Sequence, residues 1–307
     1  MRLRVRCLCR IPMSGARSDL QVTNREMSSA DFDSISIEEI AGRLIHFVKG
    51  YTDAVVAFSG GVDSSVVAAV CYHALGDRSV AVTGRGQAVA QSDLDDANLV
   101  AQQIGISHYI VETMEIQSAN YVKNDARRCY YCKSILYNTL ATWAGEHGFQ
   151  RIFSGTNLDD LGDYRPGLEA AKEHSVVAPL AELGITKEVV RKLAKYFGLS
   201  ISEKPASPCL ASRIAYGQSV TPERLRQIES AETYMHRAGY RDVRVRLHAD
   251  GLVRIEIHID DWHRVSDATH RETMLQYFSS LGFRYVTLDL GSRQSGSLNR
   301  MLPVITN

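Results

Sequence analysis

The chain has 307 residues, of which 45% are hydrophobic and 8% aromatic, and this length and composition suit one large globular domain plus a smaller one. Its 35 basic and 35 acidic residues give a formal net charge of zero, which argues against a protein that binds nucleic acid over its whole surface. No apolar run approaches the roughly 20 residues that span a bilayer, and six cysteines are too few for a disulfide scaffold. We therefore expect a cytoplasmic protein with reduced thiols and no membrane segment.

Residues 1–30 differ in kind from the rest of the chain. Five arginines precede the first acidic residue, Asp19, and no apolar segment accompanies them. We expect a disordered tail, or a start codon assigned too early with Met13 or Met27 as the true start. A transit-like segment is the alternative.

Strands and helices are predicted to alternate from residue 31 to residue 215. Ser36 and Glu39 have the spacing of a capping box, and the helix that they open ends at Gly50. The continuous apolar run at 54–58 is typical of a parallel strand covered on both faces. Further strands are expected at 79–83, 108–111 and 151–154, and further helices at 93–103, 132–146 and 187–197. This order predicts an α/β fold with a doubly wound parallel sheet.

The chain changes character near residue 215. Thr221 and Pro222 are an N-cap and an N1 residue that begin a helix, and Asp250-Gly251 between two alternating runs indicates a hairpin. A helix near 269–280 and a strand at 285–290 follow. We expect residues 216–307 to form a smaller α+β domain with an antiparallel sheet, which binds substrate or forms an oligomer interface.

A heptapeptide rich in glycine and serine lies between the first strand and the next helix: Ser59, Gly60, Gly61, Val62, Asp63, Ser64 and Ser65. The two glycines allow positive φ angles and a close approach to an anion, which free amides at a helix N-terminus would bind. The serines add hydroxyl donors, and Asp63 would act through Mg²⁺. No Gly-Lys-Ser/Thr follows, so the loop is not a Walker A motif. The full pattern favours phosphate binding over a glycine turn with serine caps.

Three cysteines lie in two segments that also carry charged residues or prolines: Cys129, Cys132 and Cys209. The spacing of Cys129 and Cys132 lets both reach one metal, and loops that follow parallel strands gather at one sheet edge, where Cys209 would join them. Four interpretations are open: buried structural thiols, a redox dithiol, a zinc site and a [4Fe–4S] cluster with one open iron. The charged and proline neighbours disfavour buried structural thiols, and the surrounding fold pattern disfavours a redox dithiol. A structural zinc site normally has four ligands and no fourth cysteine is available, so we favour the cluster.

The glycine loop resembles the pyrophosphate-binding loop of the N-type ATP pyrophosphatases, which cleave ATP between its α and β phosphates and adenylate a substrate. Several longer blocks are similar to the LarE family of pyridinium-3,5-biscarboxylic acid mononucleotide sulfurtransferases, which make a precursor of the nickel-pincer nucleotide of lactate racemase. The matching blocks, between about residues 35 and 300, are 59–65, 128–133, 155–167, 204–213, 243–257 and 296–299.

This resemblance implies an enzyme that uses ATP and Mg²⁺, forms AMP and pyrophosphate, and transfers sulfur to the substrate carboxylates through an acyl-adenylate. Family members with one cysteine, matching Cys209, give up its sulfur. Members with three resemble cluster enzymes that pass on a bound sulfide, and this chain has all three. We therefore expect the [4Fe–4S] type, with a small-molecule substrate, a sulfide donor and a homo-oligomeric enzyme.

Further residues are expected to act beside the cysteines. Lys133 and Arg213 flank them and would neutralise phosphate or acyl-adenylate charge, so that the predicted catalytic set is Cys209, Lys133 and Arg213. Strand alternation directs Arg244 and Arg246 to the same side of one strand, off its apolar face. These two arginines resemble the family's substrate-phosphate clamp and suit bidentate binding, with a solvated strand face as the alternative.

Two more acidic residues are weaker candidates for Mg²⁺. Asp160 lies in the 155–167 block, where turn and cap chemistry after a strand is the alternative. Glu256, on the second alternating run, would bind metal or act electrostatically.

Two other functions are weighed against sulfur transfer to a small molecule. Some tRNA thiolases combine a similar loop with a three-cysteine iron–sulfur site, but they need a basic, RNA-facing surface, and the zero net charge speaks against one. A non-catalytic nucleotide-binding regulator would have little use for the cysteines or for the arginine strand.

Overall fold

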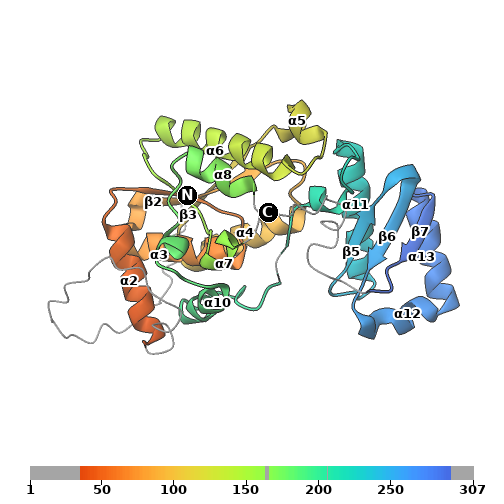
Figure 1. Cartoon of the computed structure of the whole chain (residues 1–307). Helices are drawn as coiled ribbons and strands as arrows, with labels where there is room; N and C mark the ends of the chain where they lie inside the picture. The colour runs from red at the N-terminus through yellow and green to blue at the C-terminus, as the bar shows by residue number, and fades with distance from the viewer. Residues whose placement is uncertain (1–34, 163–165, 206, 292–307) are drawn as a thin grey trace, which may run out of the picture.

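The computed structural model describes residues 35–162, 166–205 and 207–291 (Figure 1). The predicted N-terminal extension at 1–30, with Cys7 and Cys9, and the 296–299 block lie outside the described residues. Within the described ranges, no helix is both long and apolar enough to cross a membrane.

The larger unit is built on a parallel sheet with the strand order β3-β2-β1-β4. Its strands are β1 Ala54–Ala57, β2 Ser79–Arg85, β3 Ser107–Glu112 and β4 Ile152–Phe153. The longer helices of this unit are α2 Ile37–Lys49, α3 Val62–Leu75, α4 Gln91–Ile104, α6 Arg128–Glu146, α8 Pro166–Glu173 and α10 Lys187–Tyr196. The predicted α/β class and parallel sheet are confirmed.

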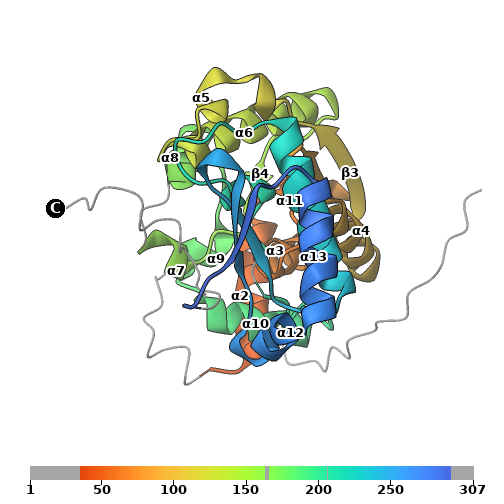
Figure 2. The ribbon, with the colours of Figure 1, turned by 90° about the vertical axis from the view of Figure 1, so that its right-hand side faces the viewer.

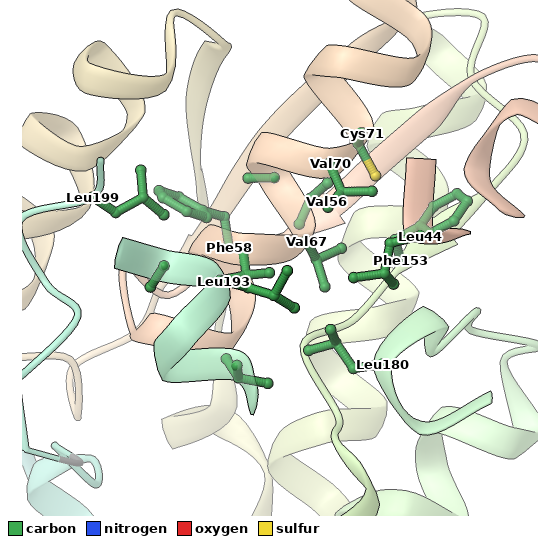
Figure 3. Packing of buried hydrophobic residues seen from close by; sticks show 14 of the residues in the cluster. Leu44, Val56, Phe58, Val67, Val70, Cys71, Phe153, Leu180, Leu193 and Leu199 are labelled. Atoms are coloured by element: carbon green, nitrogen blue, oxygen red, sulfur yellow. The ribbon is translucent and has the colours of Figure 1, made fainter. Parts of the chain in front are cut away.

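Helices cover both faces of this sheet, as Figure 1 shows with α6 and α8 above it and α2, α3 and α10 below. Val56 of β1 packs in a core with Leu44, Val67 and Leu193 (Figure 3). Its neighbour Val55 points the other way, into a second core with residues of α6 and α8. Both valines are fully buried, which explains why β1 is apolar at successive positions rather than alternate ones.

The helix that carries the paired cysteines begins one turn earlier than predicted. We expected a helix at 132–146, whereas α6 begins at Arg128. Cys129 and Cys132 therefore lie three residues apart in the first two turns of a helix, on adjacent parts of its surface.

The smaller unit has the strand order β5-β6-β7 and is shown from its outer side in Figure 2. Its elements are α11 Pro222–Arg237, β5 Arg244–Leu247, β6 Leu252–Glu256, α12 Trp262–Ser266, α13 Ala268–Ser280 and β7 Tyr285–Leu288. The hairpin is confirmed: β5 and β6 are antiparallel, and Asp250 and Gly251 adopt the left-handed φ angles of 58° and 71° that such a tight turn requires.

The expectation of a purely antiparallel sheet is wrong for β7, which pairs parallel to β6. The chain leaves β6, passes through α12 and α13, and returns in the original direction. A helical crossover of this kind joins parallel strands, whereas a tight turn joins antiparallel ones.

Short helices complete the chain: η1 Gly76–Arg78, η2 Glu115–Gln117, α5 Ala119–Val122, α7 Leu158–Leu161, α9 Pro179–Glu182, η3 Leu210–Arg213, η4 Ala249–Gly251 and η5 Ile259–Asp261. The core of the smaller unit includes Leu210, Ala211 and Ile214, which precede the predicted boundary at 215, together with Ala88 and Tyr121 of the larger unit. The segment after Cys209 is therefore packed at the junction of the two units, and the boundary itself stays a prediction.

Candidate active site

The glycine loop joins the carboxyl end of β1 to the N-terminus of α3, as predicted. Gly60 has φ 68°, and a Cβ atom there would lie 2.7 Å from Cα of Ala97 on α4. Gly61 is the N-cap of α3 with φ −77° and ψ 161°, so the expectation of a positive φ applies to Gly60 and is wrong for Gly61. In the described structure no side chain caps α3, and its first-turn amides face the loop, where an anion would be bound.

The serines of the loop hold its shape. The hydroxyl of Ser64 donates to the carbonyl of Gly61 at 3.1 Å and accepts from the amide of Ser59 at 3.2 Å, and the two serine hydroxyls are 3.1 Å apart. Ser65 is fully buried, and its hydroxyl has no partner among the residues that the structure describes. The hydroxyls of Ser59 and Ser64 thus bond within the loop, and the first-turn amides of α3 are the donors that we expect to meet a phosphate.

The carboxylate of Asp63 is held by two residues that the sequence analysis did not single out. Lys187, the first residue of α10, forms an ion pair with one oxygen, and Asn157 donates to the other at 3.0 Å. The backbone amide of Lys187 donates to the carboxylate of Asp159 at 2.7 Å, which fixes the start of α10 beside the loop. The Mg²⁺ role of Asp63 stays a prediction, with an ammonium already beside it.

Asp160 forms a capping box with Asn157, the N-cap of α7. Its carboxylate accepts from the amide of Asn157 at 3.1 Å, and its own amide donates to the Asn157 side chain at 3.3 Å. This is the cap chemistry that the sequence analysis gave as the alternative, and a metal role for Asp160 stays a prediction. The 155–167 block begins with a glycine because no side chain fits there: a Cβ atom on Gly155 would lie 2.5 Å from the amide nitrogen of Ser64.

The paired cysteines lie in a segment that follows the strand β3, whereas Cys209 lies between α10 and η3. Cys129 is exposed and Cys132 half-buried on α6, which follows β3, whereas half-buried Cys209 precedes η3. The amide of Leu210 donates at 2.8 Å to the carbonyl of Ala88 in the loop after β2, which brings Cys209 to the same edge of the sheet. Cys71 is different: it is fully buried in the main core, as expected.

The paired cysteines and Cys209 are close enough to interact electrostatically. Burial raises the pKa of the Cys132 thiol, and Cys209, Glu115 and Cys129 raise it further. In the described ranges, no three side chains of His, Cys, Asp or Glu are arranged to hold a single metal ion. Which metal group, if any, the three thiols hold stays a prediction.

Arg213 holds the Cys209 segment in place. It is 3% exposed, and its guanidinium pairs with both carboxylate oxygens of Glu232 on α11 at 3.0 and 3.1 Å. Its remaining nitrogen donates to the carbonyl of Cys209 at 3.1 Å and to that of Pro208. The positive charge is thus balanced by Glu232, a residue absent from the predictions, and a direct role of Arg213 toward phosphate stays a prediction.

Lys133 is exposed on α6 and lies beside the 155–167 block. Its Cγ atom is 3.1 Å from the position that a Cβ of Gly167 would take, and its ammonium lies 5.8 Å from the centre of the Tyr137 ring. The side chain therefore reaches the surface near the cysteines, and its contact with a phosphate stays a prediction.

Arg244 and Arg246 are 8% and 7% exposed, so the alternative of a solvated strand face is wrong. Arg246 donates at 3.0 Å to the carbonyl of Ser212 and at 3.0 Å to Glu256, whose other oxygen is paired with Arg254. Glu256 is fully buried between two arginines, an electrostatic partner in this structure, and its binding of a metal stays a prediction.

A cleft of about 720 Å³ lies between the two units. The N-terminal turn of α4, the segment around Pro208 and the helix α11 line it, together with Arg213 and Arg244. Glu229 of α11 accepts from the amide of Gln91 at 2.9 Å and so joins α11 to the start of α4 beside the cleft.

The parallel sheet and the Ser-Gly-Gly-Val-Asp-Ser-Ser loop between β1 and α3 together are those of a PP-loop α/β protein. The family model for NAD synthase matches residues 40–130. The chain is 35% identical over 264 residues to the pyridinium-3,5-bisthiocarboxylic acid mononucleotide synthase of Lactiplantibacillus plantarum, covering 84% of this chain and 93% of that protein. It therefore belongs to the LarE family of that synthase.

Two further relatives mark the breadth of the similarity. An uncharacterized protein of Synechocystis is 45% identical over 249 residues, which cover 81% of this chain and 92% of that protein. A tRNA-specific 2-thiouridylase of Rickettsia typhi is 31% identical over 191 residues, about half of each chain at 50% and 53%.

Proposed function

We propose that this protein catalyses ATP-dependent sulfur transfer to the carboxylates of pyridinium-3,5-biscarboxylic acid mononucleotide, a step in the synthesis of the nickel-pincer nucleotide. One observation carries the proposal: the PP-loop and three cysteines occur together in a chain that aligns over 84% of its length with a synthase of the bisthiocarboxylic product. The proposed enzyme works with a separate sulfide donor and as a homo-oligomer.

The first half-reaction is adenylation. A carboxylate oxygen of the substrate attacks the α-phosphorus of ATP, the bond to the β-phosphate oxygen breaks, and pyrophosphate leaves. The first-turn amides of α3 and the ammonium of Lys187 are the donors available for the phosphates, and Asp63 would bind the accompanying Mg²⁺. A carboxylate resists attack by sulfur because oxide is a poor leaving group, and AMP removes that obstacle.

The second half-reaction is sulfur transfer. A sulfide sulfur attacks the acyl carbon, the bond from that carbon to the AMP oxygen breaks, and a thiocarboxylate and AMP result. Cys129, Cys132 and Cys209 would hold a [4Fe–4S] cluster, which would supply an open iron for the incoming sulfide. Repeating both half-reactions on the second carboxylate gives the bisthiocarboxylic product.

The interdomain cleft is the proposed binding site of the substrate. Arg244 lines it, and Arg246 lies on the same strand face with a buried Nε atom that has no partner within the described chain. A buried guanidinium nitrogen without an acceptor is costly, and a phosphate oxygen would satisfy it. This supports the predicted role of the two arginines as a clamp for the substrate phosphate.

The proposal is tested with anaerobically purified protein whose iron and sulfide contents are recorded. ATP, sulfide and the pyridinium dicarboxylate mononucleotide are added, and AMP, pyrophosphate and thiocarboxylate are measured. We expect all three products with more than one turnover per chain. Absence of AMP and thiocarboxylate would overturn the proposal. Loss of hydrogen sulfide from Cys209 after a single turnover would instead show that the cysteine itself is consumed.

Thiolation of tRNA is the second candidate, favoured by the 31% identity to a tRNA-specific 2-thiouridylase. The same protein preparation is incubated with ATP, sulfide and bulk tRNA, and the nucleosides are analysed by mass. A thiolated nucleoside in place of the thiocarboxylate would promote this candidate over the first.

A further inference from the structure

Buried arginine side chains donate hydrogen bonds to the segment that carries Cys209. Its backbone carbonyls accept hydrogen bonds from three guanidinium groups: Arg213 donates to Cys209, Arg128 to Ala211 and Arg246 to Ser212. The three arginines are 3%, 5% and 7% exposed and come from η3, α6 and β5 respectively. Three buried cations directed at one short turn determine where the sulfur of Cys209 lies.

Arg128 differs from the other two because it reaches from the helix of the paired cysteines. Its Nη1 atom donates to the carbonyl of Ala211 at 2.8 Å and to the side chain of Asn124 at 2.5 Å. Its Nη2 atom lies 3.9 Å from the sulfur of Cys129. One side chain thus connects the first turn of α6 with the turn that follows Cys209.

Asn124 extends the same connection. It is fully buried with a left-handed φ of 56°, and its side-chain nitrogen donates to the carbonyls of Ala215 and Gln218 at 2.9 and 2.8 Å. The side-chain oxygen of Asn124 accepts a hydrogen bond from the guanidinium of Arg128, so the two side chains act as one connected pair. This hydrogen-bonded pair joins the start of α6 to residues 211–218, so that the two cysteine-bearing segments are held together.

The charge of Arg128 is balanced differently from that of the other arginines. Arg213 and Arg246 are paired with Glu232 and Glu256. In the part of the chain that the structure describes, no carboxylate lies within ion-pair distance of Arg128. Its titratable neighbours are the thiols of Cys129 and Cys209 and the phenol of Tyr216, whose ring centre lies 5.7 Å from the guanidinium. A buried cation that lacks a carboxylate partner is costly, so an anionic group held by the neighbouring sulfurs would stabilise it.

We propose that Arg128 is a positioning residue that fixes Cys209 opposite Cys129 and Cys132 and balances the negative charge of the sulfur group that the three hold. The identity of that group rests on the proposed function, whereas the positioning of Cys209 does not.

The test compares Arg128→Met with Arg127→Met. Arg127 is the neighbouring residue, and its side chain is exposed in an ion pair with Glu169 and above the ring of Tyr130. Two measurements need neither ATP nor a cluster: hydrogen exchange of the amides at 209–218, and the rate at which iodoacetamide alkylates each cysteine of the metal-free protein, followed by mass spectrometry. Iron incorporation and AMP formation are then recorded for the same variants.

We expect Arg128→Met to speed exchange at 209–218 and alkylation of Cys209 by about ten- to a hundredfold, the range for loss of one hydrogen bond from a charged donor, and to lower iron incorporation. AMP formation should be retained. Arg127→Met should match the wild type in all four. Arg128→Lys keeps the charge but reaches fewer acceptors, so we expect an intermediate exchange rate and iron content, and this variant serves if Arg128→Met does not fold.

Unchanged exchange and alkylation in both Arg128 variants would overturn the inference. If the wild type makes AMP but no thiocarboxylate, the proposed function fails while the exchange and alkylation data still judge the position of Cys209. The two failures are therefore distinguishable.

Discussion

Lys187 and Asp63, which are 124 residues apart in the chain, form an ion pair at the N-terminus of α3. Each has a further partner, Asp159 for the backbone of Lys187 and Asn157 for the carboxylate of Asp63. The glycine loop is therefore part of a larger site that includes the segment after β4 and the start of α10. The ammonium places a positive charge where a leaving pyrophosphate would accumulate negative charge.

Replacing this ammonium should impair adenylation. We expect Lys187→Met to lower kcat/KM for pyrophosphate release by roughly 10²–10³-fold, as for removal of one donor to a developing charge. Pyrophosphate release with ATP and the dicarboxylate substrate is the measurement. Lys192→Met on the same helix, which removes an exposed pair with Glu188, is the control and should leave the rate unchanged. Equal rates for the two variants would contradict the assignment.

Gly60→Ala should distort the loop. Its φ of 68° disfavours an L side chain, and the added methyl would lie 2.7 Å from Cα of Ala97. We expect a loss of about 1–3 kcal/mol in the free energy of unfolding, measured in urea, together with weaker ATP binding. Gly145→Ala is the control: nothing lies within 4 Å of its added methyl on α6, and the helix should gain about 0.5–1 kcal/mol. Equal stability of both variants would show that the loop relaxes freely.

Glu232→Ala should destabilise the junction of the two units. It leaves the guanidinium of Arg213 buried without its anion, and breaking such a pair from one side costs about 3–5 kcal/mol. Urea unfolding measures the change, and Glu232→Gln should lose less because the amide oxygen still accepts a hydrogen bond. Glu223→Gln, at an exposed position in the first turn of α11, should change stability by no more than about 1 kcal/mol. A near-neutral Glu232→Ala would argue that Arg213 finds other acceptors.

Cys132 should react slowly with iodoacetamide at neutral pH. The thiolate is the reactive form, and burial followed by Cys209 and Glu115 raises the pKa of this thiol. A raised pKa means less thiolate at pH 7, so we expect the rate to increase as the pH rises above the range of an ordinary cysteine. Alkylation of the metal-free protein at several pH values, read by mass, is the measurement. A free cysteine has a pKa of about 8.5. An alkylation rate that stops increasing near that pH would contradict a raised pKa for Cys132.

Cys129→Ala should abolish iron incorporation and multi-turnover transfer. Cys71→Ala is a matched control because Cys71 is fully buried in the core of the larger unit, away from α6. We expect that control to keep its iron while losing some stability. Full activity of Cys129→Ala over several turnovers would exclude the cluster mechanism.

Local patterns in the sequence predicted much of the fold. Val55 and Val56 point into different cores, which is why an unbroken apolar run predicted a strand covered on both faces. Asp250-Gly251 likewise predicted its hairpin, because a tight turn depends on residues that are adjacent in the chain. The direction of β7 could not be predicted in this way, since it depends on how α12 and α13 pack before the strand returns.

The same distinction between local patterns and long-range packing applies to the candidate site. The sequence alone determined the glycine loop, the three cysteines and the family, since these are short motifs whose chemistry lies in neighbouring residues. Only the tertiary structure decided that Lys187 pairs with Asp63, that Glu232 neutralises Arg213, and that Arg128 reaches the turn after Cys209. Each of these contacts joins residues that are far apart in the chain, and a buried charge acquires its partner only when packing brings the two together and excludes water.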